Sequence, residues 1–213
     1  MTLHAVHDYH PKEELLNALT HGIGAVLAVI GTIALLIKGI NLSWPAWSAL
    51  WIYGLSLVIL FSCSTLYHFS KQPQHRILYK KLDHIAIYYL IAGSYTPFLA
   101  IALPGTKSIW FLVMLWTMAL AGTVFKLFLI HRFQRLSLVA YLVMGWLSVF
   151  LIQDMRLHLP HGALNFLIAG GLSYTVGALF YALKSVRYTH AIWHIFVLLG
   201  AGLQFLSIYL YVI

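Results

Sequence analysis

Long runs of hydrophobic residues follow one another along the chain, separated by short gaps that contain proline, glycine or basic residues. A membrane-crossing helix needs about 20 apolar residues to span the hydrocarbon core, and each run provides that length. The runs are continuously apolar and do not alternate between apolar and polar positions, which favours helices over the strands of a barrel. The expected spans are 17–40, 46–69, 83–103, 108–130, 136–154, 162–183 and 190–212.

This pattern predicts an all-α fold, a bundle of seven transmembrane helices. Residues 1–16 are mainly polar and are expected to form an N-terminal tail, and residues 17–213 are expected to form one transmembrane domain. The tail lacks a basic segment followed by a short apolar core and a cleavage site, so we expect the first apolar run to remain as a membrane helix. No internal repeat is visible, and an inverted-repeat transporter therefore gains no support.

The composition agrees with a membrane location. Hydrophobic residues make up 62% of the 213 positions and charged residues only 8%, whereas roughly a quarter of the residues in a soluble domain are charged. The net charge of +8 comes from basic residues in the gaps and not on one amphipathic face, so nucleic acid is not an expected partner. The expected partner is the lipid bilayer.

The basic residues also predict the orientation of the chain. They gather in the gaps after the second, fourth and sixth spans and are sparse in the alternate gaps, and the gathered residues are Lys71, Arg76, Lys80, Lys81, Arg132, Arg135, Lys184 and Arg187. Cytoplasmic loops carry an excess of lysine and arginine, so we expect the N-terminus in the cytoplasm. Seven spans then place Ile213 on the opposite side.

Ionisable residues are rare inside the spans, where each costs about 2.5–3.5 kcal/mol at the middle of a helix. His68 ends the second span, Asp83 begins the third, and His190 and His194 begin the seventh, all at the expected cytoplasmic side. The two histidines of the seventh span are four residues apart and therefore share a helix face. Ser64 and His68 are also four residues apart. The gap between the second and third helices is short, so we expect these helices to be neighbours, with Asp83 close to His68.

Three imidazoles beside a carboxylate form the ligand pattern of a catalytic zinc site. We therefore expect Zn²⁺ to be bound by His68, His190 and His194, with Asp83 holding or deprotonating a water molecule and Ser64 hydrogen-bonding nearby. Simpler interpretations stay open for each residue. The histidines could lie at the membrane interface, and Asp83 could cap the N-terminus of the third helix.

A polar stripe enters the first span. Glu14, Asn17 and His21 recur at spacings of three and four residues, so they lie on one helix face. The stripe forms either a helix cap with an interfacial histidine or one wall of the metal site.

Taken together, these motifs resemble the hemolysin III family, which is related to the progestin and adipoQ receptors and more distantly to the alkaline ceramidases. The resemblance rests on E-x2-N-x2-TH-G at the start of the first span, S-x3-H in the second, LDHIAIYYLIAGSYTP around the start of the third and H-x3-H opening the seventh. It covers nearly the whole chain and implies zinc bound by His68, His190 and His194, a zinc-bound water held by Asp83, and Ser64 beside the metal. The short polar start and the single cysteine resemble the bacterial branch, which implies the inner (plasma) membrane.

Several functions fit these features. The first is a zinc-dependent hydrolase of a membrane lipid amide or ester, such as a ceramide-like amide, with Asp83 as the general base. The alternatives are a receptor or regulator that binds a lipid and holds zinc as a structural ion, and a cytolytic membrane protein. Metal transport is disfavoured because acidic residues are missing from the middle of the membrane. The identity of the lipid and the oligomeric state are not predicted.

Overall fold

The computed structural model describes residues 9–129, 134–183 and 186–213, and it contains helices and no strand within those residues. The α-helices are α1 (Pro11–Lys38), α2 (Trp44–Phe69), α3 (Pro73–Pro97), α4 (Thr106–Leu129), α5 (Gln134–Trp146), α6 (Ile152–His158), α7 (His161–Ala182) and α8 (Thr189–Tyr211). A π-helical turn, η1 (Phe98–Ala102), extends α3, and a 3₁₀ segment, η2 (Leu147–Leu151), joins α5 to α6. Seven candidate membrane spans result, which confirms the predicted fold class.

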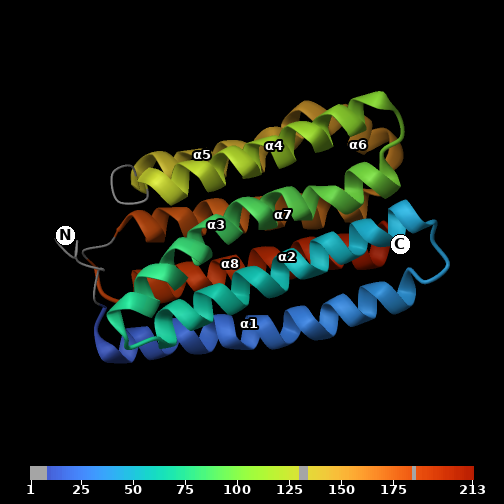
Figure 1. Ribbon diagram of the computed structural model, residues 1–213. Helices are drawn as coiled ribbons and strands as arrows, with labels where there is room; N and C mark the ends of the chain where they lie inside the picture. The colour runs from blue at the N-terminus through green and yellow to red at the C-terminus, as the bar shows by residue number, and fades with distance from the viewer. Residues whose placement is uncertain (1–8, 130–133, 184–185) are drawn as a thin grey trace.

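The helices lie side by side in one bundle (Figure 1). The most extensive helix contacts are between α1 and α2, α2 and α3, and α7 and α8, and α8 also packs against α1. By contrast, α5 approaches α3 and α7 at only a few points. The space left between these helices contains a cavity, which is described below. The helix α1 begins and α8 finishes at opposite ends of the bundle (Figure 1).

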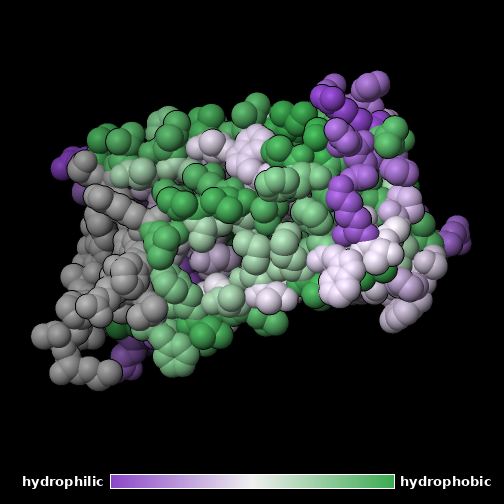
Figure 2. Space-filling view, turned by 90° about the horizontal axis from the view of Figure 1, so that it is seen from above, coloured by the Kyte–Doolittle hydropathy of each residue, from purple (hydrophilic) through white to green (hydrophobic). Residues whose placement is uncertain are grey.

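The outer surface of the bundle is strongly hydrophobic. On α1, Val26, Ile30 and Ile37 are 58–68% exposed and face away from the other helices. Figure 2 shows a broad hydrophobic band across the molecule, with hydrophilic residues gathered towards one end. Helices that satisfy their own backbone hydrogen bonds and expose apolar side chains are suited to hydrocarbon and not to water. The protein is a multi-pass membrane protein.

The first helix starts earlier than the hydrophobic pattern predicts. Pro11 occupies its first position, where a missing N–H costs nothing, and His10 accepts a hydrogen bond from the Lys12 backbone N–H at 3.3 Å. Glu13 and Glu14 lie in the first turn, where the helix dipole favours acidic side chains. Residues 11–16 are therefore helical, and Glu14 lies on a rigid element.

The prediction that α3 begins at Asp83 was wrong. The helix begins at Pro73, so that only residues 70–72 connect it to α2. The basic segment between Pro73 and Asp83 is too polar to count as a membrane run, but proline at the first position and long-stemmed lysine and arginine side chains are compatible with a helix. Asp83 lies well inside α3, which excludes its interpretation as a helix cap. Of the basic residues used to predict the orientation, Arg132 and Lys184 lie outside the described residues.

The fifth span is broken, although its sequence suggested one continuous helix. The α-helical pattern stops at Trp146 and resumes at Ile152. The Tyr95 hydroxyl of α3 donates to the Gly145 carbonyl at 2.6 Å and accepts from the Ser148 N–H at 2.8 Å. A side chain from a neighbouring helix thus satisfies backbone groups at the break, which is how an irregular segment is tolerated inside a membrane.

Candidate metal centre

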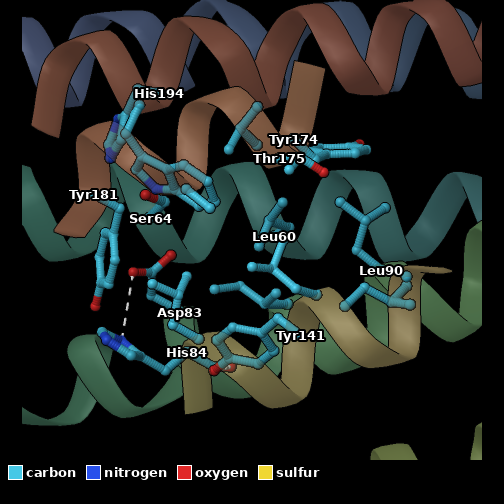
Figure 3. Close-up of a pocket in the computed structure, with 18 of the residues that line it drawn as sticks. Leu60, Ser64, Asp83, His84, Leu90, Tyr141, Tyr174, Thr175, Tyr181 and His194 are labelled. Atoms are coloured by element: carbon cyan, nitrogen blue, oxygen red, sulfur yellow. Dashed lines mark hydrogen bonds and ion pairs between the residues drawn. The ribbon is translucent and has the colours of Figure 1, made fainter. Parts of the chain in front are cut away.

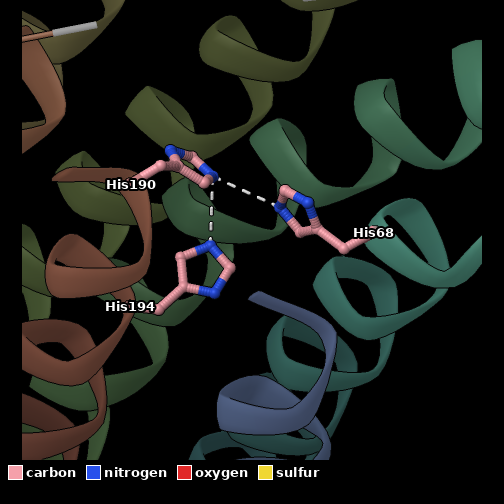
Figure 4. Close-up of side chains that lie close together, drawn as sticks. All are labelled: His68, His190 and His194. Carbon is pink, nitrogen blue, oxygen red and sulfur yellow. Dashed lines mark hydrogen bonds between the residues drawn. The ribbon is translucent and has the colours of Figure 1, made fainter. Parts of the chain in front are cut away.

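Three histidines from two distant parts of the chain meet at one end of the bundle. His68 lies in the last turn of α2, and His190 and His194 lie in the first two turns of α8. The Nε2 atom of His190 is 3.2 Å from that of His68 and 3.1 Å from that of His194 (Figure 4). His68 and His194 are buried and His190 is half-buried. The three rings therefore turn the same kind of nitrogen towards one point.

This arrangement fits a metal ion. In a tetrahedral site with Zn–N bonds of about 2.0–2.1 Å, the ligand nitrogens lie about 3.3–3.4 Å from one another. The distances at His190 are close to that spacing, and one nitrogen from each of the three rings lies within 4.8 Å of the others. Neutral imidazole is a good ligand for zinc and for several other transition metals. The three histidines could therefore hold one metal ion, with a coordination position left for another group.

Two of the rings are oriented from behind by helix α1. The Nδ1 atom of His68 is 2.6 Å from Oε2 of Glu14, whose other oxygen pairs with Arg76 of α3. The Nδ1 atom of His194 is 3.1 Å from the backbone carbonyl oxygen of Asn17. A donor hydrogen on Nδ1 leaves the Nε2 lone pair free for a metal, and such outer partners fix both the tautomer and the ring orientation.

Two aromatic stacks hold the remaining ring faces. The ring of His21 lies parallel to that of His194, with centroids 3.6 Å apart and an interplanar angle of 10°. The ring of Tyr9, just before α1, stacks on His190 at 4.7 Å and 20°. Burial raises the pKa of the Tyr9 hydroxyl, so this residue covers the site as a neutral phenol. Both stacks restrict the rotation of a candidate ligand.

A cavity of about 440 Å³ extends from the histidines into the bundle between α2, α3, α5, α7 and α8. Asp83 and Ser64 lie on its walls close to the histidines, together with His190 and His194 (Figure 3). The hydroxyl of Ser64 is buried beside the Asp83 carboxylate. Most of the remaining lining consists of apolar and aromatic side chains. The candidate metal centre therefore opens into a largely apolar cavity inside the membrane span.

The sequence is similar to that of known proteins over most of its length. A family model described as Haemolysin-III related matches residues 9–205. The chain is 41% identical over 203 residues to Hemolysin-3 of Bacillus cereus, which covers 95% of this chain and 93% of the relative. The chain belongs to the haemolysin III family. The Hemolysin-3 homolog of Bacillus subtilis is also 41% identical, over 202 residues and 94% of each chain.

This haemolysin III protein also has more distant relatives in mammals. It is 31% identical over 205 residues to the human monocyte to macrophage differentiation factor, which covers 93% of this chain and 84% of the relative. No solved structure matches the chain. The matched region contains all three candidate ligands as well as Ser64 and Asp83.

The structure brings together the residues that the sequence of this haemolysin III protein singled out. His68, His190 and His194 converge, and Asp83 and Ser64 share a cavity wall with two of them. The sequence allowed two interpretations of the polar stripe on α1, either a helix cap or one wall of the metal site. The structure places it against the histidines, through the Glu14 carboxylate, the Asn17 carbonyl and the His21 ring.

Sequence reasoning missed several residues near the centre. His84 was not singled out in the sequence, yet its Nδ1 atom lies 3.8 Å from Oδ2 of Asp83. Arg76 was interpreted only as an orientation signal, yet it pairs with Glu14. Lys126 of α4 is fully buried with its Nζ over the Tyr141 ring. A lysine inside an apolar run was a usable signal, because such residues face the interior of a bundle.

Proposed function

We propose that this haemolysin III protein is a zinc-dependent hydrolase that cleaves an amide or ester bond in a membrane lipid. The observation that carries the proposal is the convergence of three imidazole Nε2 atoms at the mouth of an intramembrane cavity that also contains a carboxylate. Three histidines that leave one position open are typical of catalytic zinc sites, whereas structural zinc sites are closed by four protein ligands.

The shape and lining of the cavity support a lipid substrate. The cavity runs along α8 from His190 to Gln204, a separation of fourteen residues that corresponds to about 21 Å of helix. Leu60, Leu90 and Ile91 are among its apolar wall residues. A long apolar space that begins at a polar reactive centre suits a molecule with a hydrocarbon chain and a carbonyl group at one end.

The chain's own residues can be given roles in hydrolysis. A zinc ion held by the histidines would supply Lewis acidity, polarising a carbonyl group and making water a better nucleophile near neutral pH. Asp83 accepts the proton of the attacking water and passes it to the leaving group. Ser64 places its hydroxyl beside the Asp83 carboxylate, and Glu14 keeps His68 in the tautomer that presents Nε2.

The basic residues near the histidines indicate which side of the membrane the candidate metal centre faces. The histidines lie at the end of the bundle where α1 begins, and the short α2–α3 connection at that end carries Lys71 and leads into the basic first turns of α3. By the positive-inside bias, this end faces the cytoplasm. We place the protein in a bacterial inner membrane, with the reactive centre at the depth of the inner-leaflet headgroups.

The test is a lipid hydrolysis screen with purified protein in vesicles. Vesicles that contain N-acyl sphingoid amides or glycerophospholipids are incubated with the wild type and with Asp83→Asn, and released fatty acid is measured by mass spectrometry. Loss of a general base costs about 10²–10⁴-fold in rate. We expect Asp83→Asn to keep its zinc and its thermal stability and to lose turnover by that factor. Asp154→Asn, which changes an exposed carboxylate on α6, is the matched control and should retain turnover.

Full turnover in Asp83→Asn would contradict the role of Asp83 as the general base. The enzymatic proposal itself would be contradicted by a wild-type protein that contains one zinc per chain and releases no fatty acid from any lipid tested. That result would favour a receptor with a structural metal ion. Leakage of vesicle contents that persists without zinc would instead support the cytolytic alternative.

A further inference from the structure

The far part of the cavity contains a hydrogen-bonding group that the proposed chemistry does not use. Tyr174 of α7 lines the cavity at the end away from Asp83 and Tyr181 (Figure 3). Its side chain packs beside Gly200 of α8, six residues beyond His194, which corresponds to about 9 Å along the helix. The Tyr174 hydroxyl is therefore too deep to take part at the metal centre.

The Tyr174 hydroxyl is buried and has no hydrogen-bond partner among the described residues. The other polar side chains near it on the cavity wall differ from Tyr174, because each has a hydrogen-bond partner within the protein. Thr175 donates to the Gly171 carbonyl at 2.8 Å and accepts from Trp146 at 3.0 Å, and Ser94 donates to the Ile91 carbonyl at 2.9 Å. A buried polar group without a partner costs about 1–3 kcal/mol, so an unpaired hydroxyl in such a wall calls for an explanation.

A second polar side chain lies one helical turn deeper. Gln204 of α8 lines the same cavity, and no hydrogen bond joins its amide to another residue in the described part of the chain. Glycines bring both side chains into the α7–α8 interface. A Cβ atom on Gly200 would lie 2.9 Å from Cζ of Tyr174, and one on Gly170 would lie 3.1 Å from Cγ of Gln204. The packing of α7 on α8 therefore depends on these two positions being small.

We propose that Tyr174 and Gln204 form a polar subsite that binds an uncharged oxygen, such as a hydroxyl group, carried on the hydrocarbon chain of the lipid. This inference rests on the proposed function, since it assumes that the lipid chain occupies the cavity. A phenol and a carboxamide can each both donate and accept a hydrogen bond, which matches a hydroxyl group. The charged residues that line the cavity, Lys80 and Asp83, lie on α3 near the metal centre, so this subsite is built for a neutral group.

The subsite would select lipids that carry a hydroxyl group on the hydrocarbon chain. A site built to hydrogen-bond a hydroxyl group disfavours the analogue that lacks it, because its own polar groups stay unpaired. A plain hydrocarbon chain would leave the Tyr174 hydroxyl unsatisfied. A chain with a hydroxyl group at the matching depth would pair with it.

The experiment measures binding and not turnover. Stearic acid and a series of hydroxystearic acids, with the hydroxyl group moved stepwise along the chain, compete with a fluorescent fatty acid for the detergent-purified, metal-loaded protein. We expect one positional isomer to bind the wild type about twofold to tenfold more tightly than stearic acid does, which is the range of one neutral hydrogen bond. Tyr174→Phe should remove this preference and keep the affinity for stearic acid, because only an unpaired hydroxyl is lost.

Ser94→Ala is the matched control. Ser94 of α3 also lines the cavity, but its hydroxyl already donates to the Ile91 carbonyl. This variant should keep the preference for the hydroxylated chain. Equal binding of all the acids to the wild type would overturn the inference, and so would a preference that survives in both Tyr174→Phe and Gln204→Leu.

The outcome separates the subsite from the proposed function. If the protein prefers one hydroxylated acid but hydrolyses no lipid, the subsite is supported and the hydrolase proposal is contradicted. If the protein hydrolyses lipid in a zinc-dependent way but shows no preference among the acids, the hydrolase proposal is supported and the subsite is contradicted.

Discussion

Removing the carboxylate behind His68 should weaken metal binding without removing a ligand. The Glu14 carboxylate lies 2.6 Å from Nδ1 of His68, and both side chains are largely buried, at 13% and 0% exposure. Loss of such an outer partner typically costs 10–100-fold in metal affinity, or about 1.4–2.7 kcal/mol. Glu14→Gln keeps a hydrogen-bond acceptor but loses the charge, and it leaves Arg76 without the carboxylate it pairs with. We expect about a 10-fold weaker zinc affinity for Glu14→Gln and up to about 100-fold for Glu14→Ala.

The assay is competition for zinc between the purified protein and a chromogenic chelator. Glu13→Gln is the matched control, because Glu13 is buried in the same helical turn but no hydrogen bond or ion pair joins its side chain to the described histidines. Its zinc affinity should stay within about twofold of the wild type, since it lacks the outer-partner role. If Glu14→Ala folds normally and binds zinc as tightly as the wild type, the assigned role of Glu14 is wrong.

Three further predictions concern stability. A chelator should lower the thermal unfolding temperature of the wild type, because a ligand at 100 times its dissociation constant stabilises the folded state by about 2.7 kcal/mol, and it should have little effect on a variant without the histidines. Gly54→Ala should destabilise the protein by about 1–3 kcal/mol in thermal unfolding, because its Cβ would lie 2.4 Å from Cγ2 of Thr32, whereas Gly202→Ala has open space and should be neutral or stabilising. Tyr95→Phe should cost about 1–3 kcal/mol in the same assay, because it leaves the Ser148 N–H at the helix break unpaired.

The sequence predicted the spans and the candidate ligands because both depend on local or strongly constrained features. Continuous apolar runs have few alternatives to membrane helices. Histidines at the ends of such runs are costly enough to be conspicuous, and the spacing of His190 and His194 places them on one face. His68 comes close to this pair because α8 packs on α1 and α1 packs on α2. The order of the helices along the chain does not specify this packing.

The sequence was less informative where side chains act across helix boundaries. The start of α3 was misplaced because the basic segment before Asp83 was interpreted as a loop, and this hid the pairing of Arg76 with Glu14. The break in the fifth span carries no proline, and it is stabilised by Tyr95 from another helix. Such tertiary hydrogen bonds leave no periodic signal in the sequence.

The most direct test is to measure zinc per chain in purified wild-type protein and in single alanine variants of His68, His190 and His194. His158→Ala, which changes an exposed histidine of α6, is the control. We predict about one zinc per chain in the wild type and the control, as one tetrahedral site requires, and a large loss in each of the three variants. Equal zinc in all five proteins would show that these imidazoles do not share an ion.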